Sequence, residues 1–402
     1  MAGATAASSA IIDERFANTQ FAKTVDFPGY SRACNPQIEP KKSRKPPAPY
    51  QSKPSRFWNG PSRASKKLPA RYWNKFPKCI IIQSVTNHLS SLVLLAAVLT
   101  QAHMLAQAAC PVPESGDLLL DKLPVIKAAI PRSGTNRFIV PTADEKSQWP
   151  PLIGFLLLGD TDSACRLIDA NQFPYSVIVF SDTTTLRTYY LLQENIPVTK
   201  GWGTYIFDPT AGNTLILEIP HPLFDMLTPE QGIDAFQQFG ATAVLIAGTH
   251  RYANTTPSSC QPTDTTSNSD VAHNIENMFQ PAHERISAAM PDGMFVQLHG
   301  NGQSSCPDVF VSNGTTNPGP TVNRILDCLQ GSGYVVEAAT DMSACPLRGT
   351  TNVQGRFTNG STDLCGQPAD SATETWTHIE QSLPPRQERQ TVINGLACAL
   401  FF

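Results

Sequence analysis

Residues 213–248 read NTLILEIPHPLFDMLTPEQGIDAFQQFGATAVLIAG and contain two apolar runs separated by a more polar segment. The apolar runs 213–220 and 241–248 are both typical of buried strands. Between them, Thr228 as a cap, Pro229 and Glu230 predict the start of a helix, and Gly240 predicts its end. A strand, a helix and a second strand in this order predict a unit with two parallel strands.

The same alternation continues through much of the remaining sequence. Strands are predicted at 175–180, 293–300 and 334–339, helices at 271–290, 321–333 and 386–400, and either a strand or an early helix at 152–159. Because the strands are nearly continuous apolar runs, both faces of their sheet are expected to be covered. We therefore predict an α/β domain over residues 151–402, with a mostly parallel central sheet flanked by helices on both faces.

The N-terminal region has a different composition. Residues 1–78 contain 15 Lys+Arg and 4 Asp+Glu without a sustained apolar period, which predicts a disordered basic leader. Residues 79–109 carry no Asp, Glu, Lys or Arg, and they combine an apolar core with Ala106 and Ala108 in an A-x-A arrangement. This pattern is typical of a signal peptide cleaved near Ala108, and an uncleaved signal anchor is the alternative.

Export predicts a secreted, periplasmic or cell-surface protein, with membrane contact only if the signal is uncleaved. The mature domain is acidic, so no nucleic-acid partner is expected for it. A Pro-rich connector is predicted at 110–150. The even number of cysteines after the signal and the absence of a C-x-x-C pair favour disulfides over a cysteine metal site. These cysteines, whose pairing the sequence leaves open, are Cys110, Cys165, Cys260, Cys306, Cys328, Cys345, Cys365 and Cys398.

Polar side chains follow three of the predicted strands. His221, His250 and His299 come directly after or at the end of separate apolar runs, in LILEIPHPLFD, AVLIAGTHRYAN and FVQLHGNG. In α/β sheets, ligands bind outside the carboxyl ends of the strands, so these histidines are expected to meet in one crevice. Histidine and carboxylate ligands that leave one position open to water are typical of catalytic zinc.

The predicted zinc ligands are His221 and His299 with either Glu218 or Asp225. Pro220 excludes a helical pairing of Glu218 with His221, whereas His221 and Asp225 can share a turn. The sequence leaves this choice open.

A metal hydrolase also needs a proton-transfer group and polar groups that hold the substrate. Glu380, near Arg386 and Arg389, is the predicted general base, and His250 or Arg251 is predicted to polarise a carbonyl oxygen or hold a carboxylate. The other predicted substrate contacts are Asn254, Asp270, His273 and Arg356.

The order LEIPHPLFD, LIAGTHRYAN, SDVAHN, FQPAH, VQLHG and a late Glu resembles that of N-formylglutamate amidohydrolases. It is similar, more distantly, to the zinc carboxypeptidase and poly-γ-glutamate hydrolase group, and the resemblance spans residues 213–389. It implies His221, His299 and either Asp225 or Glu218 as metal ligands, Arg251 as a substrate-binding residue and Glu380 as the general base. The chain departs from the amidohydrolase pattern at Pro222-Leu223.

These observations predict an exported zinc-dependent hydrolase that uses metal-activated water to cleave an amide bond, in a peptide or an N-acyl amino acid. The expected substrate is a small molecule or peptide that bears a carboxylate. The alternative is a secreted or cell-surface binding protein that has the same fold and no catalytic activity.

Overall fold

The computed structural model describes residues 110–262 and 266–402. The predicted basic leader, 1–78, and the predicted signal segment, 79–109, lie outside the described residues. Within the described ranges, no helix is long and apolar enough to cross a membrane.

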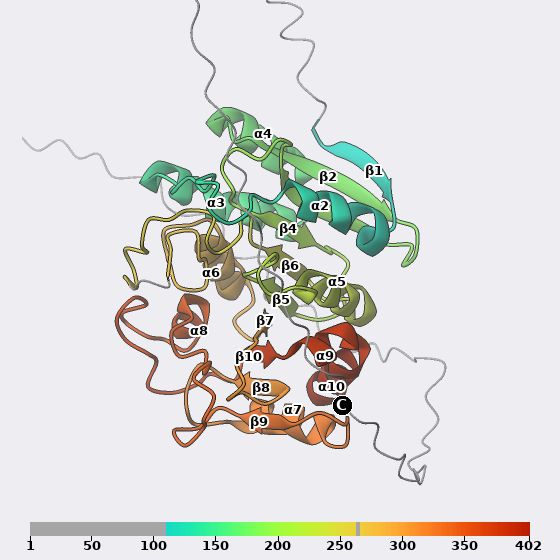
Figure 1. Ribbon diagram of the computed structural model, residues 1–402. Coiled ribbons are helices and arrows are strands. Elements are labelled where there is room, and N and C mark those ends of the chain that lie inside the picture. The colour runs from blue at the N-terminus through green and yellow to red at the C-terminus, as the bar shows by residue number, and fades with distance from the viewer. Residues whose placement is uncertain (1–109, 263–265) are drawn as a thin grey trace, which may run out of the picture. The chain divides into compact units, whose positions relative to one another are not determined.

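One mixed sheet of ten strands forms the centre of the described chain (Figure 1). Its spatial order is β1-β2-β3-β4-β6-β5-β7-β10-β8-β9. The strands are β1 (Val112–Gly116), β2 (Tyr175–Asp182), β3 (Thr188–Glu194), β4 (Thr204–Phe207), β5 (Leu215–Ile219), β6 (Ala243–Ile246), β7 (Met294–Gly300), β8 (Val309–Ser312), β9 (Val336–Ala338) and β10 (Trp376–Gln381).

The four central strands β6, β5, β7 and β10 are mutually parallel. Strand β5 lies between β6 and β7. The next strand in the chain, β6, is added on one side of β5, and the strand after that, β7, is added on the opposite side of β5. This reversal of strand order is where open α/β sheets form ligand crevices. The predicted α/β fold with a mostly parallel sheet is confirmed, and antiparallel pairs occur at β2–β3, β3–β4, β4–β6 and β8–β10.

Helices cover both faces of the sheet, as predicted (Figure 1). One layer contains α5 (Thr228–Phe239), α7 (Pro320–Leu329) and α10 (Arg389–Phe401), whose apolar residues pack with Leu217, Val296 and Ile379. The opposite layer contains α3 (Ala143–Leu157), α4 (Thr161–Asn171) and α6 (Phe279–Ala289), which pack with Ile216 and Phe295. The remaining helices are the π-helix η1 (Leu118–Lys122), α2 (Leu123–Ala129), α8 (Val353–Thr358) and α9 (Leu383–Gln387).

Several local expectations change in the structure. The ambiguous run 152–159 is helical, because a capping box between Thr142 and Glu145 starts α3 upstream of it. Residues 110–150 supply β1, η1, α2 and the start of α3, and Leu118 and Leu123 enter the core. The expected Thr228 cap is absent: the Thr228 hydroxyl donates to the Asp225 carbonyl oxygen at 2.8 Å, within the turn before α5.

The predicted disulfides are confirmed. The eight cysteines in the described part of the chain all pair, as Cys110–Cys165, Cys260–Cys365, Cys306–Cys345 and Cys328–Cys398. The Cys110–Cys165 bond ties the N-terminal end of the described chain to α4, and Cys328–Cys398 joins α7 to α10. Each bond therefore links segments that the fold already brings together.

We expect Asp182→Asn to destabilise the fold by about 1–3 kcal/mol at neutral pH, because Asp182 accepts hydrogen bonds from Leu118, Thr184, Thr185 and Gln237. Burial raises the pKa of Asp182, but these hydrogen bonds outweigh it and hold the pKa below its usual value. Its contribution is therefore complete above about pH 4 and is lost as the pH falls through the depressed pKa.

Urea unfolding at neutral and acidic pH measures this difference, with Asp292→Asn as the control because Asp292 is exposed. A deficit for Asp182→Asn that does not shrink at acidic pH would contradict the assignment.

Candidate metal centre

The candidate site lies at the carboxyl ends of the central parallel strands. Pro220 and Pro222 cannot donate to the sheet ladder, so β5 ends before them and His221 enters a turn. The Asp225 N–H donates to the His221 carbonyl oxygen at 2.9 Å, which closes this turn and brings the two side chains together. On the other side of β5, His299 lies near the end of β7 and pairs in register with Glu380 on β10.

Two imidazoles converge on one carboxylate oxygen. The Nδ1 atoms of His221 and His299 lie 3.1 Å and 3.2 Å from Asp225 Oδ2. All three side chains are buried, and one ligand atom from each lies within 4.8 Å of the other two. Tetrahedral zinc with bonds of about 2.0–2.1 Å places its ligand atoms about 3.3 Å apart, so this donor set fits the ion.

The charges of Asp225 and His299 also suit a cation, whereas the proton on His221 would have to leave when a metal binds. Burial raises the pKa of Asp225, but His221 and His299 outweigh it and hold the pKa well below its usual range. Burial lowers the pKa of His299 to about 4, so this imidazole is neutral at pH 7. Metal ligands must be an ionised carboxylate and neutral imidazoles. For His221, burial and Arg251 lower the pKa, but Asp270 and Asp225 together raise it above its usual value.

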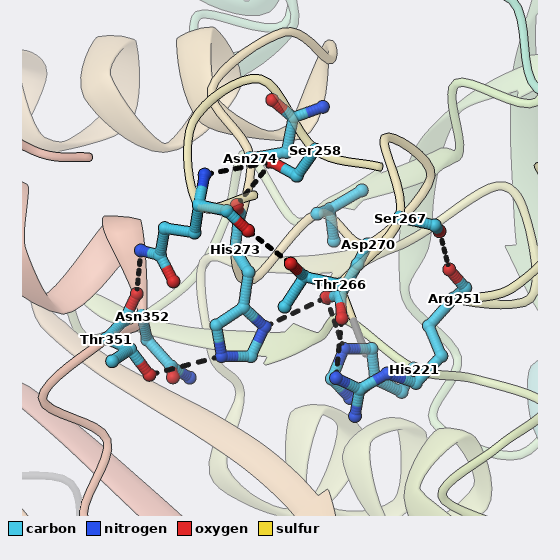
Figure 2. Close-up of polar contacts among 12 residues, drawn as sticks. His221, Arg251, Ser258, Thr266, Ser267, Asp270, His273, Asn274, Thr351 and Asn352 are labelled. Atoms are coloured by element: carbon cyan, nitrogen blue, oxygen red, sulfur yellow. Dashed lines mark hydrogen bonds and ion pairs between the residues drawn. The ribbon is translucent and has the colours of Figure 1, made fainter. Parts of the chain in front are cut away.

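A second layer of polar contacts orients His221 (Figure 2). Asp270 Oδ1 lies 2.9 Å from His221 Nε2, and Arg251 Nη2 donates to Asp270 Oδ2 at 2.5 Å. His273 Nδ1 lies 3.2 Å from Asp270 Oδ1, and its Nε2 lies 3.2 Å from the Thr351 hydroxyl. A carboxylate on the outer nitrogen is the usual support of a metal-binding histidine. His221 is therefore oriented by Asp270, which is itself contacted by Arg251 and His273.

Glu218, the rival of Asp225 in the sequence, points elsewhere. Its carboxylate lies 2.7 Å from His283 Nδ1, and it accepts hydrogen bonds from Gln297 at 3.1 Å and Trp376 at 3.4 Å. The carboxylate that approaches both His221 and His299 is that of Asp225.

Glu380 lies beside the converging histidines. Its Oε1 is 4.0 Å from His299 Nδ1 and 3.3 Å from His378 Nε2, and all three side chains are buried. Trp376, His378 and Glu380 alternate along β10 and so share one face of the sheet. The sequence drew attention to Glu380, but His378 becomes recognisable as a site residue only when 376–381 is known to be a strand.

The other predicted contacts are partly engaged with the chain itself. Arg356 donates to the carbonyl oxygens of Thr350, Leu364 and Cys365, and Asn254 donates to that of Phe138. His250 Nδ1 accepts the Tyr252 N–H at 3.1 Å, which leaves Nε2 as the protonated nitrogen of the neutral ring. Burial lowers the pKa of His250 and favours this neutral form.

The two late arginines separate in the structure. Arg389 forms an ion pair with Asp234, away from the site residues. Arg386 is buried against Gly300, which follows His299, and donates to the carbonyl oxygens of Met226 and Ser382. Burial lowers its pKa, while Asp225 and Glu380 act in the opposite direction. Arg386 is therefore a cation close to the candidate metal centre.

No family model and no curated protein matches the sequence. Among solved structures, the chain is similar to an N-formylglutamate amidohydrolase from Ralstonia eutropha JMP134, at 15% identity over 50% of this chain and 97% of that chain, with a TM-score of 0.30. It is also similar to a metallo-carboxypeptidase from Burkholderia cenocepacia, at 12% identity over 59% of this chain and 66% of that chain, with a TM-score of 0.27.

The structural neighbours thus include a member of the amidohydrolase family that the sequence resembles.

Arg251→Met is expected to destabilise the protein by about 3 kcal/mol, because it removes one partner of a buried ion pair and leaves Asp270 undercompensated. Arg389→Met, which breaks a more exposed pair with Asp234, is the control and is expected to cost at most about 1 kcal/mol. Urea unfolding at neutral pH compares the two variants. Equal losses would show that Asp270 does not depend on Arg251.

Proposed function

We propose that this protein is a zinc-dependent hydrolase of amide bonds. The observation that supports it is the approach of two imidazole Nδ1 atoms, from His221 and His299, to a single oxygen of Asp225, with all three side chains buried. Two nitrogens and one carboxylate oxygen form the three-ligand set of many catalytic zinc sites, in which the fourth position is open to water. Zinc bound there would supply an acidified water and would polarise a carbonyl oxygen.

Glu380 is the proposed general base. Its carboxylate lies within 4.0 Å of His299 Nδ1, close enough to take a proton from a water molecule beside the ligand set. The same carboxyl group can then give that proton to the departing amine. His378, at 3.3 Å from Glu380, holds one carboxylate oxygen in place on the buried face of the sheet.

His250 and Arg386 are the proposed substrate contacts. The protonated Nε2 of His250 can donate to a carbonyl oxygen, since its Nδ1 is occupied by the Tyr252 N–H. The buried guanidinium of Arg386 lies near Asp225 and Glu380, where it could pair with a carboxylate of the substrate. Arg251 acts indirectly in this proposal, because its guanidinium holds Asp270 and through it His221.

Four disulfides support the proposed location outside the cytosol, either secreted, periplasmic or at the cell surface. The proposed substrate is a peptide or N-acyl amino acid that carries a carboxylate near the cleaved amide.

His299→Ala is expected to remove bound zinc, because it deletes one of the three ligands. Elemental analysis of the purified protein after dialysis against zinc should give about one zinc per chain for the wild type and almost none for the variant. His273→Ala, which removes an imidazole that contacts Asp270 and the Thr351 hydroxyl and is not one of the three proposed ligands, is the control and should keep its zinc. Zinc retained by His299→Ala would exclude the proposed ligand set.

Glu380→Gln is expected to lower kcat by about 10²–10⁴-fold while zinc remains bound, because the amide cannot accept a proton from water. Hydrolysis of a panel of N-acyl amino acids and peptides, before and after removal of zinc by a chelator, measures the effect. A zinc-loaded wild type that binds such compounds without cleaving them would instead support a non-catalytic binding protein.

A further inference from the structure

A buried polar network lies behind His299 on the same face of the sheet. Gln297 precedes His299 by two residues on β7, so both side chains point to this face. Gln297 Oε1 lies 2.9 Å from His299 Nε2, the nitrogen that faces away from Asp225. Both residues are buried, Gln297 completely, so water does not compete for this contact.

The surrounding groups fix the orientation of the Gln297 amide. Its Nε2 donates to Glu218 Oε2 at 3.1 Å and to Gln354 Oε1 at 3.2 Å. The Gln354 oxygen can only accept here, because the Gln354 Nε2 donates to the Val271 carbonyl oxygen and to Gln280. Its Oε1 accepts from Asn352 Nδ2 at 2.5 Å. A flipped amide would set donor against donor at Asn352 and acceptor against acceptor at Gln354. The oxygen therefore has to face His299.

Glu218 is itself anchored by other elements. Its Oε1 lies 2.7 Å from Nδ1 of His283 on α6, and the Nε2 of His283 lies 2.9 Å from the Thr358 hydroxyl. Trp376 on β10 donates to Glu218 Oε2, the oxygen that also accepts from Gln297, at 3.4 Å. Glu218 is completely buried, so this set of partners holds its carboxyl group at a fixed position beside Gln297.

We infer that Gln297, oriented by Glu218, is a positioning residue that fixes the Nε2-protonated tautomer of His299 and so keeps Nδ1 free to bind a metal. The inference rests on the proposed metal site. An amide oxygen at 2.9 Å accepts the Nε2 proton, and the neutral ring then has its lone pair on Nδ1, on the side that faces Asp225, where a bound cation would be shared by the two groups. Glu218 thus acts on the site through Gln297 and His299, without contacting the metal.

The neighbouring amide makes this acceptor necessary. Asn352 Nδ2 lies 3.3 Å from His299 Nε2 as well as 2.5 Å from Gln297 Oε1. Without Gln297 Oε1, the Asn352 N–H would turn to His299 Nε2 and favour an unprotonated Nε2. The ring proton would then sit on Nδ1, where it opposes metal binding.

The test is the zinc affinity of Gln297→Met, measured by competition with a chromophoric chelator at neutral pH. Methionine keeps the length of the side chain and removes both the acceptor and the donor. We expect the zinc affinity to fall about 10–100-fold. Gln231→Met is the matched control, because Gln231 is another buried glutamine, paired with Gln381, that touches no imidazole. It should lose stability and keep the wild-type zinc affinity.

A second variant covers the case in which Gln297→Met fails to fold. The double variant Glu218→Gln with Gln297→Glu exchanges the two side chains, so it keeps the charge and still places an acceptor against His299 Nε2. Its zinc affinity should exceed that of Gln297→Met at least tenfold. If Gln297→Met does not fold, the zinc affinity of the double variant should lie within about tenfold of the wild type. Wild-type affinity in Gln297→Met, or affinity in the folded exchange variant as weak as in Gln297→Met, would overturn the inference and leave the proposed function standing. A wild-type protein that binds no zinc would overturn both.

Discussion

The site depends on the burial of the Asp225 carboxylate between two imidazoles. A charge removed from water is costly unless it is paired, so the surrounding chain has to supply compensating groups at fixed positions. His221 and Asp225 come from one turn after β5, but His299 comes from β7, the parallel strand that pairs with β5. The parallel order β6-β5-β7-β10 is what brings these groups to one edge.

Each histidine has its own support. His221 is backed by Asp270, Arg251 and His273, which belong to loops that follow β6. His299 is backed by Gln297, Asn352 and Glu218, which lie in or beside the sheet. The first support is charged and partly open to solvent at Arg251 and His273, whereas the second is completely buried. Two chemically different supports thus hold the two imidazoles against the same carboxylate oxygen.

The sequence predicted the fold where hydrophobic period and helix signals agreed. The segments around β5, α5, β6 and β7 were placed within a few residues, because apolar runs and Pro or Gly boundaries are local properties. Strands β3 and β10 contain adjacent polar residues, such as Gln193 and Glu194 in β3 and Glu380 and Gln381 in β10, so neither has a clear apolar run and neither was predicted. The four-residue strands β4 and β8 were not predicted either. Because β10 was not predicted, Glu380 had a predicted role but no place in the sheet, and His378 had neither a predicted role nor a place.

The α/β class, the presence of disulfides and the set of polar residues that follow the parallel strands could be inferred from the sequence, since each of these depends on local composition and spacing. The pairing of the cysteines and the choice of the carboxylate that meets His221 and His299 depend on contacts between residues far apart in the chain. Glu218 is three residues from His221 in the chain and Asp225 is four, but the turn closed by the Asp225 N–H directs only the Asp225 carboxylate to the histidines. The β-strand geometry directs the other toward His283 and Gln297, because side-chain direction is set by backbone conformation and by neighbours distant in sequence.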